Sequence, residues 1–285
     1  MSANRSLTRN VAVVTGASRG VGKGIAEELG AAGAVVYVTG RSVRGEAATV
    51  ALPGTVDETA DRVTRAGGTG VALHCDHRDD SQVEAVFRRV GAERGRLDLL
   101  VNNVWGGYEG LHEGRYEEFT KPFWEQPVTL WDAMFSAGVR AHYVASALAA
   151  RMMVAQGRGL IVNVSSFAGA GREPNVALGV AKGATDRLTA STAGQLRGHG
   201  VAVVSLYPGL VRTEGILKWA DQIDLSNSES PRFVGGAVAA LASDPNVLDR
   251  TGQVLVAAEL AEEYGFTDVD GEQPRSLRSE FEVVA

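Results

Sequence analysis

The stretch Thr15 to Gly22, which reads Thr-Gly-Ala-Ser-Arg-Gly-Val-Gly, constrains the fold more than any other part of the chain. It follows an apolar run at 11–14 and precedes a helix-like run at 23–29. This order is typical of a strand, a tight glycine turn and the N-terminus of a helix. Glycines in such a turn let backbone N–H groups approach an anion, and the helix dipole favours its negative charge. The stretch therefore predicts a binding site for a pyrophosphate group.

Apolar, β-branched runs alternate with helix-like segments along the rest of the chain. Strands are expected near 11–15, 34–39, 70–75, 97–102, 159–164, 201–206 and 253–257. Helices are expected near 21–32, 56–66, 80–93, 129–156, 176–198 and 232–243. This alternation predicts an α/β fold, a single Rossmann-type domain with a doubly wound parallel sheet of about seven strands and helices on both faces. We expect residues 1–258 to form this domain, with a lid at 213–231, and residues 259–285 to form a C-terminal tail packed on it.

The composition excludes several classes of protein. The chain has 285 residues, a net charge of −6 and a pI of about 5.5, so no nucleic-acid partner is expected. The single cysteine, Cys75, excludes an internal disulfide and a cysteine-based metal cluster, and His74 and His77 beside it lack further ligands. No apolar run approaches the roughly 18 residues of a membrane span. Residues 1–10 contain no apolar signal segment, so we expect a cytoplasmic protein with neither a membrane partner nor a metal.

Three irregular segments follow predicted strands. Residues 42–55 are rich in glycine and alanine, residues 104–128 carry several aromatic side chains, and residues 213–231 are polar near their end. In open α/β sheets, ligands bind beyond the carboxyl ends of the strands, so the last two segments can form the walls of a substrate pocket. The sequence leaves open the alternative that these aromatic side chains only pack a loop.

Several short motifs together resemble the short-chain dehydrogenase/reductase family. They are Thr-Gly-x3-Gly-x-Gly at 15–22, Cys75-Asp76, Asn102-Asn103, Asn163-Val164-Ser165-Ser166, Lys182, and Pro208-Gly209 with Thr213. Residues 121–125, 259–261 and 264–271 further resemble the subgroup of member 1 of that family. The resemblance runs from about residue 9 to 257. It implies a Rossmann-type subunit that binds NAD or NADP and assembles into a homodimer or homotetramer.

The resemblance also implies, position by position, which residues bind the dinucleotide. The pyrophosphate and adenosine phosphate would be lined by Gly16, Ser18, Arg19, Gly20, Val21 and Gly22. Asp76 and His77 would lie at the adenine, Asn103 at the adenosine ribose, and Lys182 at the nicotinamide ribose. The nicotinamide would be flanked by Pro208, Gly209, Val211 and Thr213.

The end of the second predicted strand indicates which dinucleotide binds. An NAD-selective site places an acid there to accept a hydrogen bond from the ribose 2′-hydroxyl. This chain reads Val38-Thr39-Gly40-Arg41 and has no such acid. Arg41 can pair with a 2′-phosphate, and Arg19 can approach it from the glycine turn. We therefore expect NADP(H), the alternative being two arginines that only face solvent.

The family's catalytic residues are an asparagine, a serine, a tyrosine and a lysine, and only two of them are present here. Lys182 places the tyrosine position four residues earlier, at Leu178, and the asparagine position falls on Gly138. Ser166 and Lys182 remain as the predicted catalytic residues. The family's usual Asn-Asn-Ala-Gly motif has Trp105 at its last position, where Gly106-Gly107 can compensate for the larger side chain.

Because leucine cannot exchange a proton, the family mechanism cannot operate unchanged. Either another group supplies the proton, or the substrate needs little acid catalysis, as with an iminium, a quinone or a conjugated enone. The candidate proton donors are Ser166, a water held by Lys182, Tyr108, Tyr116, His112 and Glu173. The predicted substrate-pocket residues are Trp105, Tyr108, Phe167 and Leu178, whereas His142 is expected to be structural.

Three functions are compatible with these residues. The first is an atypical NADP(H)-dependent oxidoreductase that acts on a hydrophobic small molecule. The second is a cyclase, isomerase or dehydratase that keeps the dinucleotide as a scaffold. The third is a dinucleotide-binding protein that has lost its chemistry. Fold resemblance alone does not choose between them.

Overall fold

The protein is built around one parallel sheet. The computed structural model describes residues 6–46, 50–107, 117–171 and 175–281. Seven strands pair in the order β3-β2-β1-β4-β5-β6-β9, and all six pairings are parallel. The strands are β1 (Val11–Val14), β2 (Val35–Gly40), β3 (Thr69–His74), β4 (Leu99–Asn102), β5 (Gly159–Val164), β6 (Val201–Tyr207) and β9 (Val254–Val256). The predicted doubly wound α/β sheet is confirmed.

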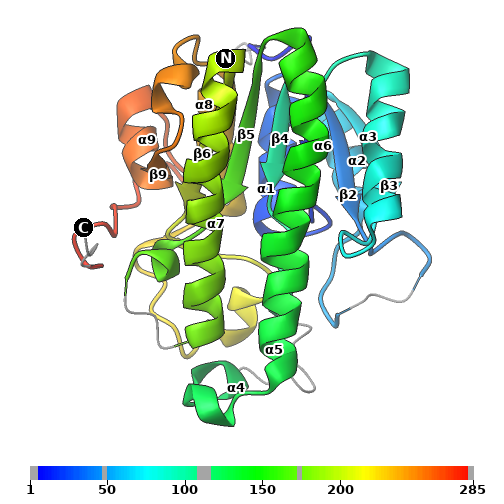
Figure 1. The fold of residues 1–285 in the computed structure, drawn as a ribbon. Helices are drawn as coiled ribbons and strands as arrows, with labels where there is room; N and C mark the ends of the chain where they lie inside the picture. The colour runs from blue at the N-terminus through cyan, green and yellow to red at the C-terminus, as the bar shows by residue number, and fades with distance from the viewer. Residues whose placement is uncertain (1–5, 47–49, 108–116, 172–174, 282–285) are drawn as a thin grey trace.

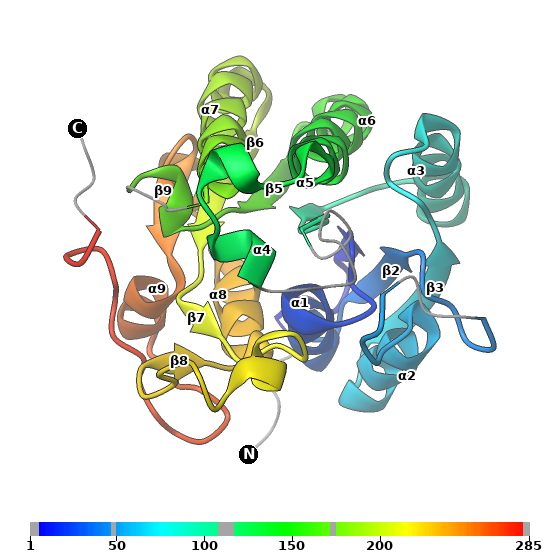
Figure 2. The same ribbon diagram turned by 90° about the horizontal axis from the view of Figure 1, so that it is seen from below.

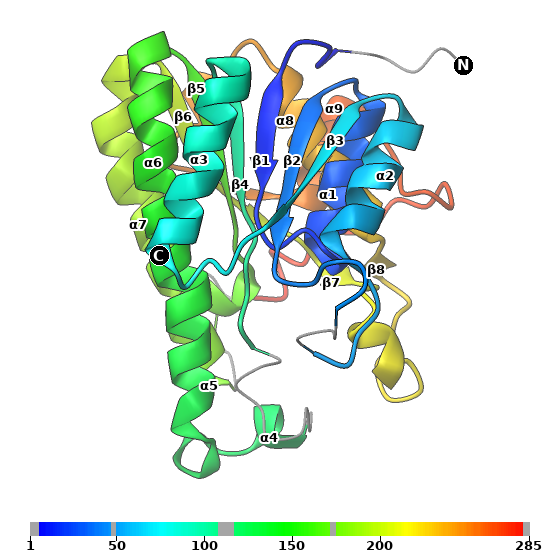
Figure 3. The same ribbon diagram turned by 90° about the vertical axis from the view of Figure 1, so that its right-hand side faces the viewer.

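Helices cover both faces of the sheet, as Figure 3 shows edge-on. One face carries α1 (Gly20–Ala31), α2 (Val56–Ala66), α8 (Pro231–Ser243) and α9 (Ala257–Tyr264). The other carries α3 (Asp80–Arg94), α6 (Ala141–Gln156) and α7 (Val176–Leu196). The short helices α4 (Glu117–Thr120) and α5 (Val128–Ala133) lie beyond the carboxyl ends of the strands (Figure 1). In the described part of the chain, no helix is both long enough and apolar enough to cross a bilayer.

Six of the seven strands contribute to two separate hydrophobic cores, whereas the edge strand β9 contributes only to the core on the α1 side. In β1, Ala12 and Val14 face the α1 side, while Val11 and Val13 face the α3 side. All four residues are buried, as expected for a sheet with helices on both faces. The continuous apolar runs in the sequence therefore reflect burial on both sides, which positions the loops at the carboxyl edge on a rigid support.

The predicted helix at 129–156 differs from a regular helix near its start. Residues Met134–Arg140 form a π-helical stretch between α5 and α6, and this stretch contains Gly138. Such stretches often occur at functional sites. A Cβ at Gly138 would have nothing within 4 Å outside its own helix, so the stretch leaves open space at this position.

A small two-stranded sheet, β7 (Leu210–Val211) with β8 (Ser228–Glu229), forms the base of the lid. The sequence analysis missed both strands because two residues carry no detectable periodicity. Figure 2, which looks at the carboxyl edge of the large sheet, shows the yellow lid beside α1.

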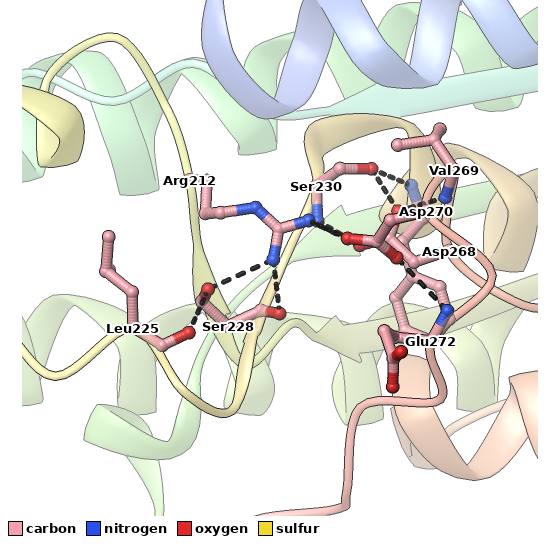
Figure 4. Close-up of polar contacts among 9 residues, drawn as sticks. Arg212, Leu225, Ser228, Ser230, Asp268, Val269, Asp270 and Glu272 are labelled. Atoms are coloured by element: carbon pink, nitrogen blue, oxygen red, sulfur yellow. Dashed lines mark hydrogen bonds and ion pairs between the residues drawn. The ribbon is translucent and has the colours of Figure 1, made fainter.

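Arg212 ties this base to the C-terminal tail (Figure 4). Its guanidinium donates to the carbonyl oxygen of Ser228 at 2.7 Å and to carboxylate oxygens of Asp268 and Asp270, each at 3.0 Å. The buried Asp268 also accepts the backbone N–H of Ser230 at 2.7 Å. The tail thus holds the lid at its base through charge-assisted hydrogen bonds.

Helices α1 and α8 approach each other closely because both carry glycine at the contact. A Cβ on Gly24 would lie 2.2 Å from the carbonyl carbon and oxygen of Pro231, and one on Gly235 would lie 2.6 Å from the carbonyl oxygen of Gly24. Both contacts involve backbone, which cannot rotate away. This close packing fixes the direction of α1, whose N-terminus follows the glycine turn.

Gly24→Ala should therefore destabilise the protein by about 1–3 kcal/mol, the usual cost of forcing an extra methyl group into a packed interior. Chemical denaturation measures the free energy of unfolding. Gly194→Ala in α7 is the control, because its Cβ would meet nothing within 4 Å and alanine favours a helix. Equal effects from the two variants would contradict the predicted close contact.

Candidate active site

A cavity of about 430 Å³ lies at the carboxyl edge of the sheet, where the strand order reverses between β1 and β4. Its lining begins at the end of β2 with Arg41, crosses the glycine turn, and reaches Lys182 on α7. Open α/β sheets bind ligands at such a reversal point. Almost all the predicted binding residues line it: Gly16, Ser18, Arg19, Gly20, Val21, Arg41, Asp76, His77, Asn103, Lys182, Pro208, Gly209, Val211 and Thr213.

The glycine turn is shaped by close backbone contacts. Gly16 and Gly20 have φ angles of +64° and +56°, which disfavour other residues. Gly22 does not line the cavity. Instead, a Cβ there would lie 2.4 Å from the Asn103 side-chain nitrogen and 2.7 Å from the Gly16 carbonyl oxygen. Asn103 donates to the carbonyl oxygens of Thr15 and Gly16, each at 3.0 Å. The end of β4 thereby fixes the turn in front of α1.

Three guanidinium groups gather at the β2 end of the cavity, on Arg19, Arg41 and Arg78. Burial lowers the pKa of Arg41, and the positive charges of Arg78 and Arg19 lower it further. Arg19 donates to Ser42 Oγ and to the carbonyl oxygen of Gly54, both at 2.9 Å. This end of the cavity is therefore complementary to an anion.

Asp76 and His77 differ in charge at neutral pH. Arg78 binds the Asp76 carboxylate through both Nε and Nη2, at 3.0 and 2.7 Å, and this pairing lowers the pKa of Asp76 to about 2. His77 is buried, its Nε2 lies 2.7 Å from Thr39 Oγ1, and burial lowers its pKa to about 4. In the described part of the chain, no three metal-ligating side chains cluster.

At the other end of the cavity, Lys182 and Ser166 lie beside the end of β5. Lys182 Nζ donates to the carbonyl oxygen of Val164 at 3.0 Å. Burial lowers the pKa of Lys182 to about 8, while the charge of Asp186 opposes that shift. The neighbouring Ser165 hydroxyl donates to the Lys182 carbonyl oxygen at 3.3 Å. This end therefore provides an amine and two hydroxyl groups that can exchange protons.

Leu178 lines the cavity and belongs to an apolar cluster with Trp105, Met134 and Ala181. It lies in the first turn of α7, where its backbone N–H is capped by Asn175 Oδ1 at 2.9 Å. No phenol lines the cavity among the residues that the structure describes. Four of the proposed donors lie outside the described residues: Tyr108, His112, Tyr116 and Glu173.

The predicted pocket aromatics divide into three groups. Trp105 lines the cavity, and its ring lies against Gly107, where a Cβ would be 2.0 Å from it. Phe167 does not line it, because its ring is buried between Tyr207 and Phe281, each with a centroid 5.1 Å away. Phe123 and Trp124 are 60 % and 72 % exposed.

His142 lies beneath this end of the site. It is buried, and its Nε2 lies 3.1 Å from the Val104 carbonyl oxygen. Burial, followed by the charge of Lys182, lowers its pKa to about 3. A neutral imidazole that supports a loop is consistent with the expected structural histidine.

Comparison with known proteins identifies the family. Residues 10–223 match the family described as short chain dehydrogenase. The chain belongs to this family. It is 43% identical over 275 residues to the mouse protein Dehydrogenase/reductase SDR family member 1, with 92% of this chain and 83% of that protein covered.

Solved structures of short-chain dehydrogenases are also similar. A metagenomic short-chain oxidoreductase in complex with NADP has 31% sequence identity and a TM-score of 0.69, covering 88% of this chain and 97% of its own. A 7α-hydroxysteroid dehydrogenase complexed with NADH and 7-oxo glycochenodeoxycholic acid has a TM-score of 0.73 at 23% identity, covering 96% and 98%. The first supports family membership, and the second supports the fold.

Several residues that line the cavity could not be predicted from the sequence motifs. Arg78 and Glu214 line the cavity, as do Val104, Ala137 and Leu52. Arg78 was detectable, since it is the third residue after Cys75 at a strand end that already carries Asp76. Glu214 follows Thr213 directly, but no sequence signal shows that the lid returns it to α1.

Glu229 on β8 is a buried carboxyl group behind the cavity wall. Its Oε2 lies 3.0 Å from the position that a Cβ on Gly209 would take, and only 1 % of the residue is exposed. Burial raises its pKa to about 8, and the Gly209 N–H only partly opposes this shift. The folded protein therefore holds Glu229 in its neutral form at neutral pH.

Glu229→Gln should stabilise the protein increasingly as the pH rises. A carboxyl group whose pKa increases from 4.5 to about 8 on folding favours the native state fully below pH 4.5, and this advantage is lost as the pH approaches 8. Glutamine does not ionise, so the variant does not lose this stability. Its increase in Tm over the wild type should be smallest near pH 5 and should level off above pH 8. Exposed Glu280→Gln is the control. A gain that does not change with pH would contradict a neutral Glu229.

Proposed function

We propose that this protein is an NADP(H)-dependent oxidoreductase that reduces a carbonyl, enone, quinone or iminium group of a hydrophobic small molecule. One observation carries the proposal. A single cavity presents an arginine cluster at one end, and Ser166 and Lys182 beside an apolar wall at the other. A 2′-phosphate fits the first end, and a reacting group fits the second.

Two features of the cavity support dinucleotide binding. Gly22 lets the Asn103 side chain pack against the glycine turn, and the first turn of α1 faces the cavity at Gly20 and Val21. Arg41 and Arg78 would hold the adenosine 2′-phosphate, and Lys182 would hold the nicotinamide ribose. When bound, the nicotinamide supplies or accepts a hydride.

The proton chemistry would depend on Lys182 and Ser166. With a pKa near 8, Lys182 is close to the value suited to proton transfer at neutral pH. The Ser166 hydroxyl would polarise the substrate oxygen, and Lys182 would deliver a proton through a bound water. A positioned general acid contributes roughly 10²–10⁴ in rate, whereas alignment of reactants contributes roughly 7–11 kcal/mol. The loss of the tyrosine thus leaves most of the geometric contribution.

The apolar wall indicates a hydrophobic substrate. Trp105, Ala137 and Leu178 line the cavity, and Trp105 and Leu178 belong to one apolar cluster beside the place proposed for the substrate. Their side chains offer contact area without hydrogen bonds, so binding would favour an aromatic or polycyclic group over a polar one.

The proposal includes assembly into a homodimer or homotetramer. Val180 on α7 and Tyr143 on α6 are 46 % and 59 % exposed, and Trp131 on α5 is 41 % exposed. Apolar exposure on adjacent helices is consistent with a covered face, and the family resemblance supports the same assembly.

Arg41→Ala should weaken NADPH binding by roughly 10- to 100-fold and leave NADH binding within about threefold, because only NADPH carries the 2′-phosphate. Isothermal titration calorimetry measures both dissociation constants. Arg44→Ala is the matched control, since Arg44 is exposed and already pairs with Asp61 at 2.6 Å. Equal losses for the two dinucleotides would contradict NADP selectivity.

Leu178→Tyr should increase the rate of ketone reduction by roughly 10²–10⁴-fold, because it returns a proton donor four residues before Lys182. Stopped-flow absorbance of NADPH with a panel of ketones measures the rate. Leu178→Phe supplies the ring without the hydroxyl and should give no such gain. If the two variants are equally active, Lys182 and Ser166 are not arranged as we propose.

A non-redox cyclase, isomerase or dehydratase is the second candidate. Gly138 and Leu178 stand at the family's asparagine and tyrosine positions, and both favour this candidate. Gly138 leaves open space, and Leu178 puts an apolar side chain where the family has a proton donor. It predicts turnover with NADP⁺ or NADPH alike. Stoichiometric oxidation of NADPH during turnover would exclude it, and NADPH binding without turnover of any substrate would favour a silent binding protein.

A further inference from the structure

Residues 213–219, which we call the strap, cross the mouth of the cavity from the end of β7. The strap includes the short helix Ile216–Trp219, and its residues Thr213, Glu214, Gly215 and Ile216 line the cavity. The described structure holds the strap at two points.

The first point is the N-terminus of α1. Gly20 N–H donates to Glu214 Oε2 at 2.8 Å, and the other carboxylate oxygen of Glu214 pairs with Lys23 Nζ. Burial raises the pKa of Glu214, but its bonds from Lys23 and Gly20 prevail and lower it overall. Glu214 is therefore an anion at neutral pH, held where the helix dipole and the Lys23 ammonium both attract negative charge.

The second point is the connection between β2 and α2. Lys218 Nζ donates to the Ala51 carbonyl oxygen at 2.6 Å. Within the strap, Ile216 N–H donates to Thr213 Oγ1 at 3.3 Å, which keeps the segment compact between its two contacts. The Glu214 carboxylate is thus held in place by the strap geometry as well as by its own partners.

We propose that Glu214 is an internal competitor for the pyrophosphate site, and that a dinucleotide must displace its carboxylate to bind. This inference rests on the proposed function. The Gly20 N–H and the Lys23 ammonium suit a phosphate oxygen as well as they suit a carboxylate oxygen. Two anions at one helix N-terminus repel each other, and partial burial strengthens that repulsion. Once Glu214 leaves, Gly20 and Lys23 become ligands for phosphate, so Glu214 sets the affinity of the site.

The test compares Glu214→Gln with the wild type by isothermal titration calorimetry, using NADPH and, separately, inorganic pyrophosphate. Glutamine keeps the size of the side chain but removes its charge. Both ligands should bind roughly 5- to 20-fold more tightly to the variant, as expected for the loss of one charge-assisted contact. Asp221→Asn removes the same charge from an exposed residue nearby and should change neither dissociation constant by more than about twofold.

Glu214→Ala provides a second variant, which should shift both ligands in the same direction. Thermal unfolding establishes that each variant is folded. If the wild type binds NADPH and neither Glu214 variant binds it more tightly, the competitor role is wrong. An equal gain for Asp221→Asn would also overturn it, since the effect would then be general charge repulsion. If neither the wild type nor any variant binds NADPH, the proposed function is wrong, whether or not pyrophosphate binds.

Discussion

The N–H groups in the first turn of α1, which have no partner within the helix, are the constraint on which the site depends. Several independent features serve to present them: positive-φ glycines in the preceding turn, the Asn103 side chain that holds that turn, and the glycine contact that directs α1. In the described structure, a carboxylate of the protein itself already meets the first of these groups. The fold therefore presents a positive partial charge that some anion must neutralise.

The cavity joins two chemically different ends along this anion site. The β2 end is cationic and carries Arg41 with Arg78, whereas the far end combines Lys182 with an aliphatic wall at Leu178. Burial makes Lys182 a weaker base than an exposed lysine. In our proposal, the cationic end supplies affinity and the far end supplies chemistry, so substitutions at one end should leave the other largely intact.

Local patterns predicted much of the fold. The glycine turn, the seven strands and the main helices follow from short-range periodicity, and the cavity gathers nearly all the residues implied by the family resemblance. Features set by tertiary contacts were missed. The pairing of β7 with β8, the π-helical stretch at Gly138 and the return of Glu214 to α1 all join residues without a local signature. Phe167 was predicted in the substrate pocket, but its ring packs in the core beside Tyr207.

The link between Arg212 and Asp268 spans 56 positions of sequence and crosses from the lid to the tail. During synthesis the lid emerges first, and its guanidinium has no carboxylate to meet until the tail follows. Both carboxylates that bind Arg212 lie beyond α9, whereas all seven strands of the large sheet precede it. A truncation or a fusion point in this tail should therefore disturb the entrance to the cavity before it disturbs the sheet.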